Sequence, residues 1–222
     1  DDDGLSWSNA MPAFGGDKPW MTSDPDRGAL YLTWSDSPSC CEDRIFTRSL
    51  DGGSTFEQPV EIPGTPTLGT LAVGVNGEVY LAGLRDDWWF GVARADAPYD
   101  PDRPLEFETT AVDLGGMFPL VDSPNPGGLA SQIWVAVDRS NGPFRGSVYL
   151  LSTVNPPGPD PMDVVISRSD DRGESWTPPV PVLVDLSADL RRALRGGDLR
   201  ATSASGRAWF PHRAFRRRAP CL

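Results

Sequence analysis

The chain has 222 residues, including 23 glycines, 23 prolines and eight tryptophans, with a formal net charge of −11. The aromatic content argues against a disordered chain, and no apolar run approaches the roughly 20 residues of a membrane-spanning helix. Residues 186–222 hold nine arginines and two aspartates, a net of +7, which leaves −18 on the other 185 residues. Such a body repels a phosphate backbone, so its charge disfavours nucleic-acid binding.

Short apolar or alternating runs bounded by Gly, Pro or Asp recur in three groups of four. In chain order they are 20–24, 30–34, 44–48 and 56–62, then 71–74, 79–82, 89–94 and 105–112, then 133–138, 148–151, 163–168 and 176–184. The second run of each group has the pattern Gly-x-apolar-Tyr, which places Tyr31, Tyr80 and Tyr149 at equivalent positions. Alternation is typical of strands, and helical periodicity is absent before about residue 185. Repeated four-stranded units indicate an all-β protein, a β-propeller of four-stranded antiparallel blades.

A turn motif, S-x-D-x-G-x-[ST]-[WF], lies between the third and fourth runs of two groups. Its copies are Ser49, Asp51, Gly53 and Phe56; Ser169, Asp171, Gly173 and Trp176; and, without the initial Ser, Asp2, Gly4 and Trp7. The Asp side chain can accept hydrogen bonds from backbone N–H groups further along the turn, glycine allows the left-handed backbone, and the aromatic residue anchors the hairpin. We therefore expect these residues to be structural and not catalytic.

The motif resembles the Asp-box, or BNR repeat, of sialidases and related β-propellers, over about residues 1–185. The resemblance implies a propeller of six blades, of which about three are present. The predicted segments are the end of a blade at 1–16, blades at 17–64, 65–130 (with a degenerate box and a crossover loop) and 131–185, and a basic segment at 186–222. That segment is open to four interpretations: the start of a further blade, an aberrant terminus, a short helix followed by disordered sequence, or a polyanion-binding arm.

The resemblance also implies that substrate binds on the face that carries the loops between second and third strands and the crossovers between blades. The candidates there are Asp17, Lys18, Asp36, Asp43, Arg85, Asp86, Asp87 and Trp88, with further polar groups at Asp122, Asn125, Asn155 and Asp160. Carboxylates beside an aromatic ring suit sugar binding and glycoside hydrolysis.

Catalysis by a sialidase requires more than this set of residues. The family holds the substrate carboxylate with three arginines, one of them in an Arg-Ile-Pro motif, and uses a Tyr–Glu pair as nucleophile. No Arg-Ile-Pro occurs in this sequence, and only Arg85 and Arg44 are near the relevant face. No catalytic residue of the family can be assigned here.

Three functions therefore remain open. The chain could be a fragment of a secreted or cell-surface exo-α-sialidase-like glycoside hydrolase, a non-catalytic propeller module that binds glycan or protein, or an inactive fragment. No cofactor or metal is expected, because three cysteines and a single histidine lack metal-ligand spacing. Cys40 and Cys41 are expected to be free or loosely paired thiols. Unpaired strand edges predict self-association.

Overall fold

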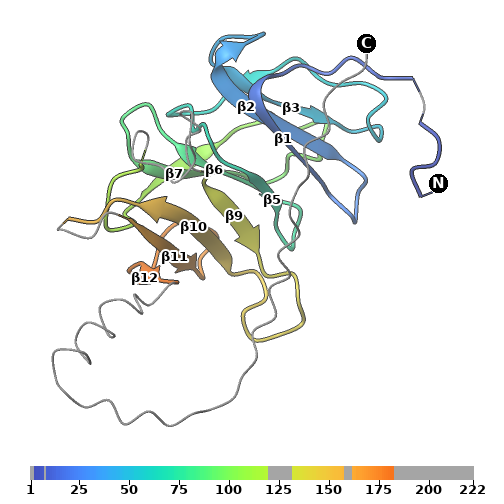
Figure 1. The fold of residues 1–222 in the computed structure, drawn as a ribbon. Coiled ribbons are helices and arrows are strands. Elements are labelled where there is room, and N and C mark those ends of the chain that lie inside the picture. The colour runs from blue at the N-terminus through green and yellow to red at the C-terminus, as the bar shows by residue number, and fades with distance from the viewer. Residues whose placement is uncertain (1–2, 8, 120–131, 158–161, 183–222) are drawn as a thin grey trace, which may run out of the picture. The chain divides into compact units, whose positions relative to one another are not determined.

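The computed structural model describes residues 3–7, 9–119, 132–157 and 162–182, all within a compact unit that spans residues 1–183. These residues form twelve strands in three antiparallel sheets and contain no helix (Figure 1). The prediction of an all-β protein with four-stranded antiparallel units is confirmed, although the described residues do not form a closed propeller. Residues 120–131, which form most of the predicted crossover, and the basic segment 186–222 lie outside the described residues.

Each sheet takes its four strands in chain order. Sheet 1 contains β1 (Gly16–Ser23), β2 (Leu30–Ser39), β3 (Arg44–Ser49) and β4 (Val60–Glu61). Sheet 2 contains β5 (Leu71–Val73), β6 (Val79–Leu84), β7 (Phe90–Ala95) and β8 (Glu108–Val112). Sheet 3 contains β9 (Trp134–Val137), β10 (Val148–Val154), β11 (Asp163–Ser169) and β12 (Val180–Pro181).

The tyrosine repeat occupies the same register position in all three sheets. The cross-strand partners are Tyr31 with Arg48, Tyr80 with Arg94, and Tyr149 with Arg168. Side chains directly opposite each other on antiparallel strands share one face of the sheet. The three sheets are therefore structural repeats of one unit, as the spacing of the tyrosines indicates.

The fourth strands after the two complete turn motifs are shorter than the sequence pattern predicts. β4 and β12 have two residues each, whereas β8 has five. Pro59 precedes β4, and prolines at 178, 179 and 181 surround Val180, while β8 has none. Proline lacks the N–H that a ladder hydrogen bond requires, so these prolines limit the pairing.

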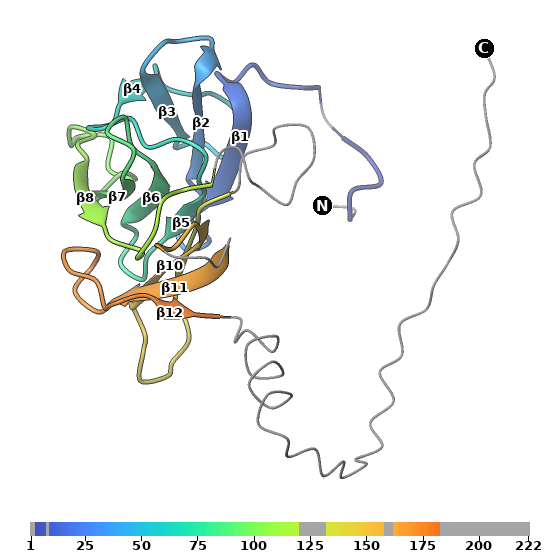
Figure 2. The same cartoon turned by 60° about the vertical axis from the view of Figure 1, so that its left-hand side comes forward.

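Sheet 2 is buried on both faces, because it lies between sheet 1 and sheet 3 (Figures 1 and 2). Its alternating residues enter two separate hydrophobic clusters. The members from sheet 2 include Val79, Leu81, Ala93 and Ala95 toward sheet 1, and Tyr80, Ala82, Phe90 and Val92 toward sheet 3. Burying each large apolar side chain contributes roughly 1.5–3 kcal/mol, so these two interfaces are the main apolar core.

The first strands of the three sheets lie side by side, because β5 contacts both β1 and β9. The ring centroids of Trp20 in β1 and Trp134 in β9 are 5.1 Å apart in an edge-to-face arrangement. A salt bridge of 2.6 Å joins Arg139, after β9, to Asp26, after β1. Sheets 1 and 3 are thus in direct contact at their first strands.

The cysteine prediction was wrong. Cys40 and Cys41, in the turn between β2 and β3, form a disulfide bond with each other. The backbone N–H of Cys40 donates to the carbonyl of Gly15, and Cys40 Sγ accepts from the N–H of Gly15. These contacts hold the turn against the segment that precedes β1.

Candidate functional site

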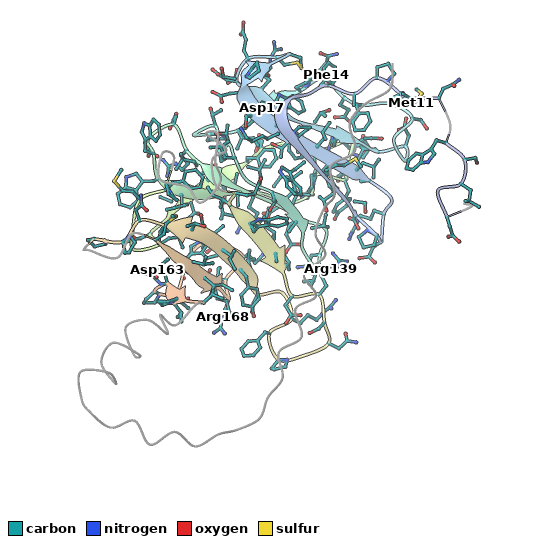
Figure 3. All side chains as sticks on the ribbon, viewed as in Figure 1. Met11, Phe14, Asp17, Arg139, Asp163 and Arg168 are labelled. Carbon is teal, nitrogen blue, oxygen red and sulfur yellow. A yellow bond between two sulfur atoms is a disulfide. The ribbon has the colours of Figure 1, made fainter. Side chains whose placement is uncertain are left out.

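The two ends of the sheets differ in what they carry. One end, here the turn end, carries the turns at 50–55 and 170–175 that belong to the two complete copies of the turn motif. The other, here the groove end, carries the β2–β3, β6–β7 and β10–β11 loops. Figure 3 labels Asp163 and Arg168, which mark the groove end and the turn end of β11.

At the turn end, the Asp51 carboxylate binds its own turn. It accepts hydrogen bonds from the backbone N–H of Thr55 at 2.9 Å, the hydroxyl of Thr55 at 2.6 Å and the hydroxyl of Ser49 at 2.8 Å. The same Ser49 oxygen accepts from the N–H of Gly53, which has a left-handed backbone with φ of 90°. The donors leave Asp51 little capacity for a ligand.

The second turn repeats this network. Asp171 accepts from the backbone N–H of Ser175 at 2.9 Å, the Ser175 hydroxyl, and the Ser169 hydroxyl at 2.7 Å. The hydrogen bond from the Ser175 hydroxyl is the largest cause that lowers the pKa of Asp171 to about 2, and that from the Thr55 hydroxyl does the same for Asp51, also to about 2. Hydrogen bonds to the charged form of a carboxyl favour that form.

The third motif copy shares one local contact with the second. The indole Nε1 of Trp7 donates to the carbonyl of Gly4 at 3.1 Å, and that of Trp176 donates to the carbonyl of Gly173 at 3.2 Å. Asp2 lies outside the described residues. The offset of three residues thus produces the same contact in both copies.

At the groove end, two hollows lie on either side of Trp88. The first hollow, between sheets 1 and 2, has a volume of about 450 Å³. Its lining residues are Asp36, Asp43, Thr65, Thr67, Leu68, Leu84, Arg85, Asp86 and Trp88. Five of the eight predicted candidates, Asp36, Asp43, Arg85, Asp86 and Trp88, are therefore brought together from two sheets.

The second hollow lies between sheets 2 and 3 and has a volume of about 780 Å³. It is lined by Asp87, Trp88, Trp89, Phe90, Asp113, Gly115, Gly116, Met117, Asn155, Pro156 and Pro157. We call the two hollows together the Trp88 groove. Both volumes lie in the range of ligand pockets, about 300–1,000 Å³.

Exposed apolar side chains border the second hollow. Trp88 is 63% exposed, Trp89 is 53% exposed and Met117 is 72% exposed. Folding leaves these large apolar surfaces in water, and such clusters mark binding surfaces. The sequence pattern predicts a strand that begins at Trp89, and it does not indicate Met117 or Asp113 as site residues. Two adjacent tryptophans beside a turn could have indicated that Trp89 belongs to the site. No comparable sequence feature indicates Met117 or Asp113.

The β6–β7 loop is a tight turn closed by its own backbone. The N–H of Arg85 donates to the carbonyl of Trp89, and the N–H of Trp88 donates to the carbonyl of Arg85. The Arg85 guanidinium donates through Nη2 to Asp87 at 2.7 Å. A Cβ added to Gly91 would lie 2.5 Å from Arg85 Cδ, so this glycine makes room for the arginine stem.

The groove lining departs from ordinary backbone geometry. Thr65, Leu68 and Trp88, which all border the first hollow, have φ values of 40°, 61° and 68°. A non-glycine residue in this left-handed region costs roughly 1–2 kcal/mol. Strained backbone of this kind tends to gather at functional sites, so it supports the assignment of the groove.

Two further candidates do not enter the groove. Asp17, on β1 near Phe14 (Figure 3), and Lys18 form a salt bridge of 2.7 Å with each other. The hydrogen bond from Lys18 is the main reason that the pKa of Asp17 lies below its usual value. Neither residue borders either hollow. Asp122, Asn125 and Asp160 lie outside the described residues.

A Tyr–Glu pair occurs at the other end of sheet 2. The Tyr80 hydroxyl lies 3.3 Å from Glu78 Oε1, and both residues are buried. Burial is the main cause that raises the pKa of Tyr80, and the nearby Glu78 charge adds to it. A tyrosine held protonated in the core, away from the groove, does not suit a nucleophile. Within the described residues, this pair is therefore structural.

No cluster of three or more metal-ligating side chains occurs within residues 3–7, 9–119, 132–157 and 162–182. In the same part of the chain, no helix has the length and apolar character needed to cross a bilayer.

No protein-family model matches this sequence, and no curated protein matches it. Solved structures similar to the chain include an intramolecular trans-sialidase from Ruminococcus gnavus (17% identity, TM-score 0.40) and a sialidase from Streptococcus pneumoniae (13%, 0.41). A third is a GH43_12 protein from a capybara gut metagenome (16%, 0.42). The likeness covers 70%, 69% and 78% of this chain but only 27%, 19% and 31% of those proteins. All three TM-scores lie below 0.5.

Proposed function

We propose that the chain binds glycans through the Trp88 groove. The observation that carries this proposal is the exposed Trp88 indole between two hollows, each of which contains carboxylates. Sugar rings have apolar C–H faces and polar rims, so an aromatic plate flanked by hydrogen-bond acceptors is complementary to them. Asn155 adds an amide oxygen, Oδ1, that is buried and has no hydrogen-bond partner among the described residues.

We further propose that the three sheets are blades of an Asp-box propeller of the sialidase-like kind. Under this proposal the blades extend over 17–64, 65–130 and 131–185, and the protein is secreted or at the cell surface. The repeated Tyr–Arg register and the repeated turn networks support the assignment of the three sheets as equivalent blades.

Glycan binding can be tested with the whole chain by recording the indole N–H signals in NMR spectra. Methyl glycosides of galactose, glucose, mannose and N-acetylneuraminic acid are the probes. We expect at least one to shift the Trp88 signal, which the variant Trp88→Phe identifies. If none of the glycosides shifts the Trp88 or Trp89 signal at tens of millimolar, the proposal is wrong.

Glycoside hydrolysis is the second candidate function. It is favoured by the first hollow, where Asp36, Asp43 and Asp86 line one space, because glycosidases use two carboxyl groups on either side of the scissile bond. Release of p-nitrophenol from aryl glycosides measures it. Activity that Asp43→Asn or Asp86→Asn abolishes would support hydrolysis, whereas activity that survives both changes would exclude these residues as the catalytic pair.

A further inference from the structure

The Trp88 groove contains far more negative than positive charge. Its two hollows are lined by five carboxylates, Asp36, Asp43, Asp86, Asp87 and Asp113, and by one guanidinium, that of Arg85. The formal charge of this lining at pH 7 is therefore −4. A concave surface with charges of one sign focuses the field inside it and lowers the local concentration of ligands with the same charge.

The single guanidinium of the lining is already paired with a carboxylate. Arg85 is already bound to Asp87 at 2.7 Å, and its side chain is only 22% exposed. Its Nε is buried and has no hydrogen-bond partner among the described residues, and a Cβ added to Gly64 would lie 3.1 Å from that nitrogen. Bidentate binding of a carboxylate requires two N–H groups that point together at the ligand. The hydrogen bond to Asp87 already uses one of the five N–H groups of Arg85, and the Asp87 carboxylate balances the charge of the guanidinium, so an acidic ligand would compete with Asp87.

The other arginines of the described repeats are engaged elsewhere. Arg48 and Arg94 lie at the turn end of their strands, where they form hydrogen bonds to neighbouring loops. Arg44, the second arginine expected near the substrate face, lines neither hollow. The groove thus combines an aromatic plate with acceptors and a negative field, and it lacks a free cation in the described part of the chain.

We propose that the Trp88 groove selects uncharged sugars and rejects sugars that carry a carboxylate, including sialic acids. This inference rests on the proposed glycan binding and adds the ligand class. A neutral sugar stacks on Trp88 and donates its hydroxyl protons to the aspartates, whereas the carboxylate of an acidic sugar meets a lining with a net charge of −4. Carboxylates are acceptors only, so they suit the hydroxyl donors of a neutral sugar.

Matched pairs of glycosides that differ by one charge test the inference. The pairs are methyl α-galactoside with methyl α-galacturonide, methyl α-glucoside with methyl α-glucuronide, and the methyl ester of the methyl α-sialoside with the free acid. Shifts of the Trp88 indole signal give the affinity of each. In every pair with a binding member, we expect the uncharged member to bind about tenfold tighter or more, because the net charge of −4 on the lining repels a carboxylate on the ligand.

Salt and charge removal provide the controls. Raising the ionic strength from 20 to 300 mM should narrow the difference within a pair, because salt screens exposed charges. The double variant Asp43→Asn, Asp86→Asn should also narrow it, by about fivefold to tenfold, while the variant Asp102→Asn, in the loop before β8 and outside the groove lining, should leave it unchanged.

The outcomes separate the two proposals. A charged member that binds as tightly as its neutral partner, or more tightly, overturns the ligand class but leaves glycan binding intact. If no member of any pair shifts Trp88 or Trp89, glycan binding at this groove fails, and the ligand class fails with it.

Discussion

The guanidinium of Arg48 donates a hydrogen bond of 2.6 Å to the carbonyl oxygen of Pro98, which belongs to the loop between β7 and β8 of the next sheet. Arg94, at the equivalent position of sheet 2, donates to the carbonyl of Arg172 in sheet 3 at 3.0 Å. The repeated arginine therefore connects each sheet to the next. In sheet 3 the equivalent Arg168 pairs with Asp170 of its own turn and lies over the ring of Phe144.

Replacing Arg48 with alanine should destabilise the protein by about 2–3 kcal/mol, because buried carbonyls lose a charged donor. Arg48 is only 4% exposed and also binds Glu57 at 2.8 Å. Arg168→Ala is the matched control: its side chain is 34% exposed, so the loss should stay below about 1 kcal/mol. Urea denaturation of both variants measures the difference. Equal losses would show that the contact between sheets contributes little.

The Asp171 turn should make stability depend on acid pH. Because the folded state lowers the Asp171 pKa to about 2, its contribution is fully present above the ordinary value near 4 and is lost as pH falls through 2. Asp171→Asn should therefore lower the melting temperature at pH 7 by roughly 2–4 °C, and the gap to the parent should close between pH 4 and 2. Ser175→Ala, which removes the main donor, should act in the same direction. A gap that stays constant across this range would contradict the assignment.

Trp88→Gly should leave stability unchanged or raise it slightly. Glycine adopts the left-handed backbone of this position without the roughly 1–2 kcal/mol cost that a tryptophan incurs, and the lost side chain is mostly exposed. The neighbouring Trp89 has no positive φ, so Trp89→Gly should cost about 1 kcal/mol through added chain freedom. Thermal denaturation compares the two variants. A large loss for Trp88→Gly would mean that the indole packs into the fold and is not reserved for a ligand.

Gly69→Ala should severely destabilise the fold, by more than about 3 kcal/mol. A Cβ at this position would lie 1.8 Å from the carbonyl oxygen of Ala82, so the backbones of the crossover and β6 would have to separate. Gly15→Ala is the control, because a Cβ there meets nothing within 4 Å, and it should change stability by less than about 0.5 kcal/mol. Soluble expression and denaturation report both effects, and a well-folded Gly69→Ala protein would refute this packing.

The sequence was sufficient for the repeats, because strand alternation and turn chemistry are local. Each of the twelve predicted runs overlaps a strand of the structure, and the three tyrosines lie in equivalent registers. The ends of the fourth strands were predicted less well, since proline limits their pairing at β4 and β12. The pairing of Cys40 with Cys41 was also missed, because bridges between adjacent cysteines are uncommon and the sequence pattern does not indicate one.

The candidate groove was only partly predictable. Turn-rich loops that carry Asp and Trp identified Asp43, Asp86 and Trp88, because loop position follows from strand order. The packing of neighbouring sheets brings these three residues to one hollow. It also adds Met117 to the groove lining and leaves Asp17 outside that lining. The sequence by itself determined which residues form each four-stranded unit. Only the tertiary structure decided which side chains share a space and that Arg85 is already paired, because both depend on contacts between residues far apart in the chain.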